Sequence, residues 1–211
     1  IDVFEDDARV QEFTGEYNPD MYLLDTDNPF TMGPLDLQDF YFEHKRQQVE
    51  AMRNVQEVVE SVGKEYGELS GRSYGIFEEY KTEDAEFIAV AMGSTAGTVK
   101  VAVDTMREQG KKAGLLKLRM FRPFPGNEIV EALSGAKKVA VMDKACSFGL
   151  EGGPVFHEIR SFAYGKDLHF KSYIYGLGGR DITVQQIIEI FDDLELSSPE
   201  DDIVQFFGVR E

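Results

Sequence analysis

Short uncharged apolar runs alternate with amphipathic stretches through the second half of the chain. Residues 87–92 read FIAVAM, which favours a strand covered on both faces, as in a parallel sheet. The next apolar positions have the i, i+3, i+4 spacing of a helix, with Gly110 as its stop. These positions are Val99, Ala102, Val103 and Met106. A second strand is predicted at residues 115–121, ended by Pro123 and Pro125. Together they predict one right-handed βαβ unit.

The same alternation continues to the end of the chain. Further strands are predicted at residues 138–142, 170–175 and 203–209. Helices are predicted from Asn127 as a cap to Leu133, over 155–164, and after a Thr183/Gln186 capping box. Residues 75–211 are therefore predicted to form a three-layer α/β domain with a mostly parallel five-stranded sheet. Its predicted core includes Val90, Ala102, Leu116, Leu118, Val139, Val141, Ile174, Ile187 and Phe191.

The first 74 residues have a different pattern, and we expect them to form a separate part. Residues 1–35 are rich in Asp, Pro and Gly but also in large apolar residues, which indicates an irregular arm lying against an apolar surface. A long helix is predicted over residues 36–65, capped by Asp36 and ended by Gly63, Gly67 and Gly71. Its thin apolar stripe is typical of a connector or of a helix that packs on a neighbouring subunit.

Composition and net charge exclude several classes of binding partner and indicate the cellular compartment. The net charge of −17 argues against binding to nucleic acid or to anionic membranes. No apolar run approaches the roughly 20 residues of a membrane-spanning helix. The single cysteine excludes an internal disulfide framework and suits a reducing compartment, so we expect a cytoplasmic protein. The chain begins at Ile1 without a signal-peptide pattern, and we interpret it as the interior of a longer protein.

Three glycine-rich loops are candidate anion sites, each with a structural alternative. The loop GSTAGT at 93–98 lies between a strand and a helix, but we expect a tight turn in which Ser94 or Thr95 caps the helix. The glycines at 149–153 and 176–179 lie where open α/β sheets present ligands, and the alternative is that they are turn residues between a strand and a helix. Cys146 and His157 are a weak nucleophile–base candidate, and we expect neither catalytic residues nor metal ligands in this chain.

Basic residues gather between 111 and 122. Lys117 and Arg119 alternate with apolar residues on a predicted strand, where charges must be paired or reach an interface. We consider Lys117, Arg119 and Arg122 possible interface residues.

The string MGSTAGTVKVAVDTMREQGKKAGLLKLRMFRPFP, residues 92–125, closely resembles the α-subunits of the 2-oxoacid:ferredoxin oxidoreductases, most of all those acting on pyruvate (pyruvate synthases). DNPFTMGPLDLQDFYFEHKRQQVEAM at 27–52 resembles the end of that family's first domain, and GRSYGIFEEYKTEDAE at 71–86 resembles the entry to its second. YGLGGRDIT and the final FFGVRE also fit. The resemblance covers essentially the whole chain.

The resemblance implies a subunit fragment of an enzyme that decarboxylates a 2-oxoacid on thiamine diphosphate and reduces ferredoxin through iron–sulfur clusters. It implies a fold similar to the C-terminal domain of transketolase. Thiamine diphosphate, Mg²⁺ and the clusters are expected elsewhere in the complex, and ferredoxin and coenzyme A are expected to act through other subunits. This segment would then serve assembly. The alternative is a free-standing α/β domain that binds a small anion or nucleotide.

Overall fold

A computed structural model describes residues 3–4, 6–33 and 35–210. Ile1 and two members of the acidic stretch, Asp2 and Glu5, lie outside this description. Contacts divide the chain into two compact units, residues 1–48 and 49–211. The helix that precedes the sheet is thereby grouped with the sheet, and the boundary between 1–74 and 75–211 stays a prediction.

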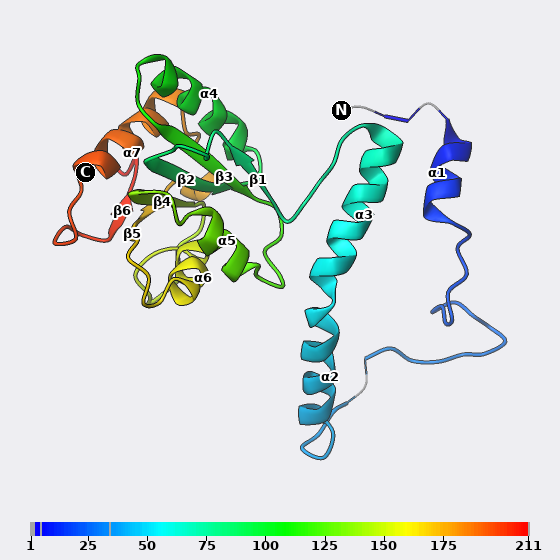
Figure 1. The fold of residues 1–211 in the computed structure, drawn as a ribbon. Helices are drawn as coiled ribbons and strands as arrows, with labels where there is room; N and C mark the ends of the chain where they lie inside the picture. Colours follow the sequence, from blue (N-terminus) through cyan, green and yellow to red (C-terminus); the bar gives the residue numbers. More distant parts are fainter. Residues whose placement is uncertain (1–2, 5, 34, 211) are drawn as a thin grey trace. The chain divides into compact units, whose positions relative to one another are not determined.

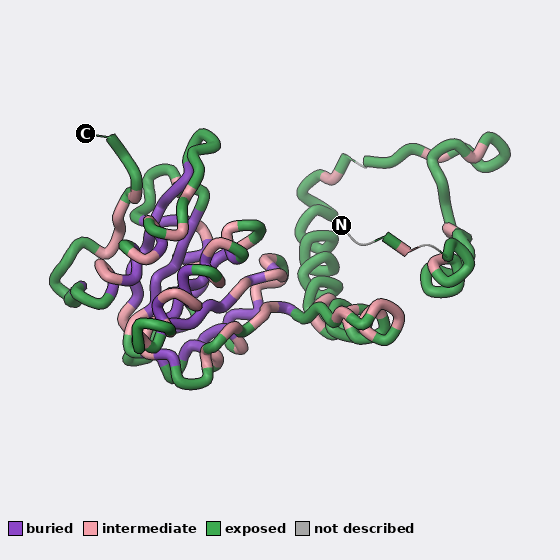
Figure 2. Tube along the Cα trace, turned by 90° about the horizontal axis from the view of Figure 1, so that it is seen from above, coloured by how far each residue is buried: buried purple, intermediate pink, exposed green. Residues whose placement is uncertain are grey.

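The first unit consists of a short helix, an irregular arm and the start of a second helix. Helix α1, Asp7–Thr14, begins where Asp6 Oδ1 accepts a 3.0 Å hydrogen bond from the Ala8 N–H. It ends at Gly15, whose φ of 72° is the left-handed backbone that glycine adopts at little cost. None of the described residues of this unit is buried, as the burial-coloured trace shows (Figure 2).

The predicted long helix is two helices, α2 at Tyr41–Arg53 and α3 at Val55–Ser70, separated at Asn54. The expected cap at Asp36 was wrong, because α2 begins at Tyr41, and the Asp36 carboxylate instead lies 2.8 Å from His44 Nδ1. The expected stops at Gly63 and Gly67 were also wrong, whereas Gly71 ends α3 with a φ of 73°. Gly63 and Gly67 lie inside α3, at positions against which the chain after the helix passes. A Cβ at Gly63 would overlap the Tyr74 carbonyl, and a Cβ at Gly67 would overlap the Ser73 hydroxyl.

The sheet has six strands in the order β1-β3-β2-β4-β5-β6, one more than predicted. The added strand is β1, Phe77–Tyr80, which pairs antiparallel with β3 at one edge. All other pairs are parallel. The remaining strands are β2 at Phe87–Met92, β3 at Ala113–Leu118, β4 at Lys138–Asp143, β5 at His169–Ile174 and β6 at Val204–Phe206.

Helices cover both faces of the sheet, which makes the predicted three-layer α/β fold (Figure 1). Helices α4 (Thr95–Glu108) and α7 (Val184–Leu196) pack on one face, with Ala89 and Tyr173. Helices α5 (Gly126–Ala132) and α6 (Pro154–Phe162) pack on the other, with Val90 and Leu118. Neighbouring residues of β2 therefore enter opposite cores, which explains its uninterrupted apolar run. The predicted core is confirmed, since each of its nine named residues is at most 2% exposed.

The predicted helix caps are confirmed only in part. The capping box at α7 is confirmed, with the Gln186 N–H donating to Thr183 Oγ1 and Gln186 Oε1 accepting from the Thr183 N–H. The predicted cap at Asn127 was wrong, because Pro125 precedes the first turn of α5. A short 3₁₀ turn, η1 at Leu177–Gly179, connects β5 to α7. None of the helices in the described ranges is both long and apolar enough to cross a membrane.

Candidate functional site at the carboxyl edge of the sheet

The order of the strands places a topological switch point between β2 and β4. From β2 the chain crosses through α4 to β3 on one side, and from β4 it crosses through α6 to β5 on the other. Loops at such a point diverge, and open α/β sheets bind ligands in the resulting crevice. A ligand at this switch point would contact residues 93–95, which follow β2, and residues 143–153, which begin with the last residue of β4.

The loop after β2 leaves the first turn of α4 without a side-chain cap. Ser94 takes the N-cap position but makes no capping hydrogen bond, so the prediction of a Ser94 or Thr95 cap was wrong. The Thr95 hydroxyl instead accepts a 2.8 Å hydrogen bond from the Tyr175 hydroxyl, at the end of β5. Burial raises the pKa of Tyr175, as does the nearby Asp143 charge, against the lowering effect of the hydrogen bond to Thr95. The phenol therefore stays protonated and donates.

After β4, a carboxylate of the chain itself, that of Asp143, binds the first turn of α6. Asp143 is 3% exposed, and its two carboxylate oxygens accept hydrogen bonds from the N–H groups of Val155, at 3.0 Å, and Phe156, at 3.1 Å. These N–H groups begin α6, where the helix dipole favours a negative charge. Burial nevertheless raises the pKa of Asp143, against the lowering effect of both hydrogen bonds and of His157. Asp143 thus occupies the position at α6 that a ligand anion would take.

Gly153 makes that arrangement possible. Its φ of −94° is available to any residue, so backbone conformation does not require glycine here. A Cβ at this position would, however, overlap the Asp143 side chain. The glycine is therefore needed for the close approach of Asp143 to the start of α6. Sequence reasoning had interpreted the glycines of this loop only as turn residues or as a ligand loop.

The other chemistry-bearing residues of the region are not brought together. Cys146 is exposed, and its Sγ lies 4.0 Å from the neighbouring Ser147 carbonyl. No contact joins it to His157, whose Nε2 is buried without a hydrogen-bond partner among the described residues. His44 and His169 contact Asp36 and Ser197, respectively. Within the described ranges no group of three or more His, Cys, Asp or Glu side chains could hold a metal ion.

The possible interface residues Lys117 and Arg119 converge on one carboxylate. Glu78 of β1 lies 2.5 Å from Arg119 and 3.9 Å from Lys117, and it also pairs with Lys100 of α4. The hydrogen bond from Lys100 lowers the pKa of Glu78, as do the charges of Arg119 and Lys117. Glu78 was missed in the sequence because four residues, FEEY, show no usable strand periodicity.

Arg122 also has a partner within the chain, the Glu158 carboxylate at 2.6 Å. The neighbouring basic residues Lys111 and Lys112 are likewise held, by Asp192 and by Glu86. The basic cluster is therefore compensated by acidic residues of the same domain. Whether Lys117, Arg119 and Arg122 also meet another subunit remains a prediction.

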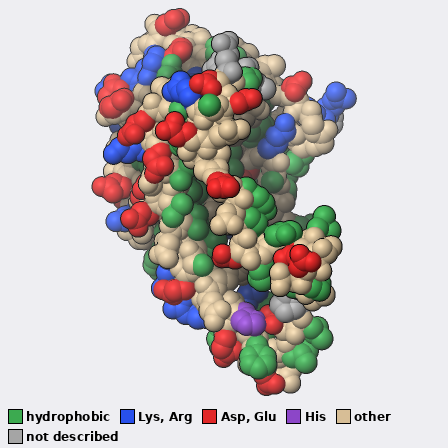
Figure 3. Space-filling view, turned by 90° about the vertical axis from the view of Figure 1, so that its right-hand side faces the viewer, with side chains coloured by type: hydrophobic (Ala, Val, Ile, Leu, Met, Phe, Trp, Pro, Cys, Tyr) green, Lys and Arg blue, Asp and Glu red, His purple; other side chains and the backbone are tan. Residues whose placement is uncertain are grey.

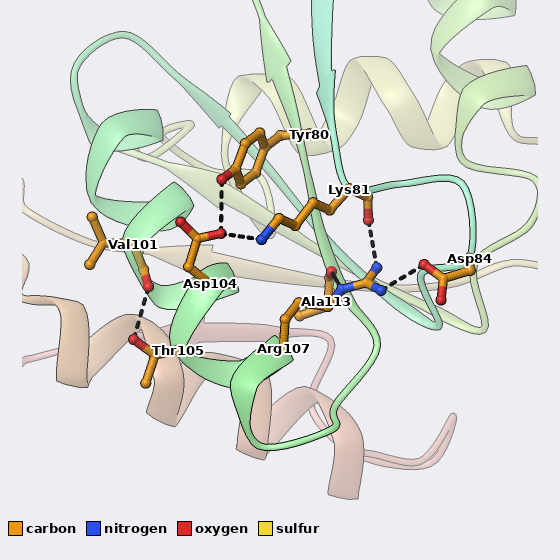
Figure 4. A network of polar contacts seen from close by, with 8 residues as sticks. All are labelled: Tyr80, Lys81, Asp84, Val101, Asp104, Thr105, Arg107 and Ala113. Carbon is orange, nitrogen blue, oxygen red and sulfur yellow. Dashed lines mark hydrogen bonds and ion pairs between the residues drawn. The ribbon is translucent and has the colours of Figure 1, made fainter.

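A second polar network attaches the edge strand β1 to α4 (Figure 4). Asp104 accepts hydrogen bonds from the Tyr80 hydroxyl, at 2.8 Å, and from Lys81 Nζ, at 2.5 Å. Arg107 donates to the Asp84 carboxylate, at 2.6 Å, and to the carbonyls of Lys81 and Ala113. Every donor and acceptor in these contacts belongs to this chain, so we infer that the network stabilises the edge of the sheet.

The family model and the similar proteins found by comparison all point to one enzyme family. Residues 85–187 match the family model described as pyruvate:ferredoxin oxidoreductase core domain II. Pyruvate synthase subunit PorA of Thermotoga maritima is 47% identical over 210 residues, which are 99% of this chain and 53% of that protein. Ketoisovalerate oxidoreductase subunit VorA of Pyrococcus horikoshii is 41% identical over 189 residues, which are 88% of this chain and 48% of that protein. A solved 2-oxoglutarate:ferredoxin oxidoreductase from Magnetococcus marinus is 20% identical, with a TM-score of 0.43 over 62% of this chain and 21% of that one.

The chain spans about half the length of the curated relatives it matches. The family match includes the MGSTAGT and RPFP segments on which the sequence resemblance depended. The chain therefore belongs to the α-subunit family of the 2-oxoacid:ferredoxin oxidoreductases, with residues 85–187 matching core domain II.

Proposed function

We propose that this chain is an assembly segment in the α-subunit of a thiamine-diphosphate-dependent 2-oxoacid:ferredoxin oxidoreductase. The complete enzyme would decarboxylate a 2-oxoacid oxidatively and reduce ferredoxin. Pyruvate is the first substrate to test, because the relative with 47% identity is a pyruvate synthase subunit. The proposed place of action is the cytoplasm, in keeping with a single cysteine and no disulfide.

The observation that carries the assembly role is the exposure of large apolar side chains before the sheet. None of the described residues of α1, α2 and α3 is buried. Leu35, Phe40 and Phe42 are 85%, 64% and 78% exposed, which is unusual for so many large side chains in one stretch. Hydrophobic side chains also reach the surface among acidic ones in the space-filling view (Figure 3). The proposed partners are other domains or subunits of the enzyme.

The residues of this chain do not fit the enzyme's cofactors. One cysteine cannot supply the four thiolates of an iron–sulfur cluster. A Mg²⁺–diphosphate group needs several oxygen ligands in near-octahedral array, and the described residues offer no such cluster. At α6, moreover, Asp143 would repel a diphosphate. We therefore place thiamine diphosphate, Mg²⁺ and the clusters on other parts of the complex, through which ferredoxin and coenzyme A also act.

The alternative, a free-standing domain that binds a small anion or nucleotide, is weakened at one of its two loops. Asp143 fills the start of α6 after the 149–153 glycines. The uncapped start of α4 after Gly93 stays open to this alternative.

The assembly role is tested in the complete enzyme, purified with all of its subunits. We expect Phe42→Asp to reduce recovery of the assembled complex and pyruvate-dependent ferredoxin reduction in parallel, because the apolar contact is lost. Val101→Asp is the matched control, since Val101 is 53% exposed on α4. An intact complex of normal activity with Phe42→Asp would contradict the assembly role. Faster turnover of 2-oxoisovalerate than of pyruvate would overturn the substrate assignment alone.

A further inference from the structure

A cavity lies at the amino edge of the sheet, opposite the carboxyl edge. Strand β6 pairs with β5 only from Ser172 to Ile174, so the first half of β5 has no strand beside it on that side. The loop at 198–203 passes there and, with the end of α6 and the loop after it, lines an open cavity of about 300 Å³. A volume of this size suits a small molecule.

One main-chain amide of β5 faces this cavity. The Ser172 N–H points toward β6, where it donates to the Ile203 carbonyl at 2.8 Å. Main-chain groups two residues apart point the same way along a strand, so the N–H and C=O of Phe170 face the cavity that Phe170 lines. The described part of the 198–203 loop gives Phe170 no backbone hydrogen bond. A ligand therefore meets one donor and one acceptor that the fold leaves available.

Two basic side chains on one wall have no carboxylate partner among the described residues. Arg160 of α6 lies over the Phe156 ring, 5.7 Å from its centroid, and Lys166 follows in the next loop. Both line the cavity. In a chain of net charge −17, Lys111, Lys112 and Lys117 all form ion pairs with carboxylates, and two cations without an ion pair among the described residues at one cavity favour a ligand carboxylate.

The 198–203 loop contributes the opposite charge. Asp201 and Asp202 line the cavity, and Asp201 accepts a 2.6 Å hydrogen bond from the Ser198 N–H. Lys171 cannot neutralise them fully, because its Nζ is held 2.7 Å from Asp193. A simple anion would be repelled by Asp201 and Asp202, and a simple cation would be repelled by Arg160 and Lys166. A zwitterion satisfies both walls.

His169 adds no positive charge. The Ser197 hydroxyl donates to the Leu194 carbonyl at 2.8 Å, so it accepts from His169 Nε2 at 3.0 Å, which assigns the proton to Nε2. Burial lowers the pKa of His169, and the charges of Lys138 and Lys171 lower it further, against the raising effect of Asp201. The imidazole is therefore neutral at pH 7. The rest of the lining is largely apolar, including Ala163, Leu168, Pro199 and Ile203.

We propose that this cavity binds a small α-amino acid with an aliphatic side chain. Its carboxylate meets Arg160 and Lys166, its ammonium meets Asp202 and the Phe170 carbonyl, and its side chain contacts Leu168 and Ile203. The site is distinct from the carboxyl edge and does not depend on the proposed enzymatic role, because it uses only this chain's own residues.

Titration calorimetry of the full chain with L-valine tests the site. Isovalerate, which lacks the ammonium group, and isobutylamine, which lacks the carboxylate, are the matched ligands. We expect valine to bind and both analogues to bind at least about tenfold more weakly, since each leaves one charged wall unpaired. Isovalerate or inorganic phosphate binding as tightly as valine would overturn the zwitterion assignment, as would no valine binding at millimolar concentration.

Two substitutions locate the site. Lys166→Met and Asp202→Asn should each weaken valine binding about tenfold or more. Lys144→Met, at the carboxyl edge, is the control and should leave it unchanged. Unfolding curves of all three should match the parent chain, because these side chains are exposed. Unchanged binding in both test variants would show that valine binds elsewhere and would refute the site. If either variant fails to fold, Arg160→Gln replaces it.

Discussion

Asp143 and Gly153 illustrate what a single residue contributes at the carboxyl edge. The buried carboxylate satisfies two N–H groups that begin α6, and the glycine leaves room for it. Gly153→Ala should destabilise the chain by about 1–3 kcal/mol, because a Cβ there displaces a packed group. Gly135→Ala is the matched control: a Cβ at Gly135 meets open space, so its effect should stay within about 0.5 kcal/mol. Urea unfolding measures both, and equal effects would refute the close-approach argument.

This pair also marks the limit of sequence reasoning at the site. The loop was correctly placed after β4, because the apolar run and the glycines are local signals. The role of Asp143 was not predicted, because its partners Val155 and Phe156 follow 12 and 13 residues later and meet it only when α6 packs on the sheet. The Ser94 or Thr95 cap failed for a similar reason. The Thr95 hydroxyl is used by Tyr175, 80 residues away.

At the scale of elements, two glycines inside helices distinguish the effect of helix propensity on stability from the effect of tertiary packing. Gly97 lies inside α4 with open space around its Cβ position, whereas a Cβ at Gly63 in α3 would overlap the Tyr74 carbonyl. Gly97→Ala should stabilise the chain by about 0.5–1 kcal/mol through the higher helix propensity of alanine. Gly63→Ala should destabilise it by about 1–3 kcal/mol, because the overlap outweighs that gain. Thermal or urea unfolding checks the opposite signs, and a stabilising Gly63→Ala would show that residues 73–74 do not pack on α3.

The elements that were predicted well are those with a strong local signal. Strands β2 and β4 are uninterrupted apolar runs buried on both faces, and the α7 capping box satisfies itself within four residues. Strand β1 was missed because its stability comes from elsewhere: Glu78 is held by Lys100 and Arg119, and Tyr80 by Asp104. Gly63, Gly67 and Gly71 look alike in sequence. Of these, only Gly71 has a positive φ and ends the helix.

At the scale of the whole chain, stability is concentrated after residue 75. The first buried residue in the described part of the chain is Ile76, and both core clusters begin later, at Ala85 and Ala89. The contact-based unit nevertheless starts at Val49 and so includes α3. Contacts between α3 and residues later in the chain include the hydrogen bond of Gln56 with Glu128 at 3.0 Å, the packing of the Tyr66 and Tyr74 rings, and the close approach of the Tyr74 backbone to Gly63. Whether these contacts make α3 part of the folded domain is an energetic question.

Urea unfolding of three chain lengths, residues 1–211, 49–211 and 75–211, tests whether α3 belongs to the folded domain. We expect all three to unfold cooperatively with similar urea m-values, because the surface buried on folding lies after residue 75. Removing residues 1–48 should leave the free energy of unfolding unchanged within about 0.5 kcal/mol. Removing residues 49–74 should cost no more than about 1–2 kcal/mol, the worth of the part-buried Gln56–Glu128 hydrogen bond and of the contact between Arg119 and the Tyr74 ring. A loss above about 3 kcal/mol, or a fall in m-value on removing 49–74, would make α3 part of the cooperative unit. The boundary would then lie at residue 48, and the predicted division at 74 would be wrong.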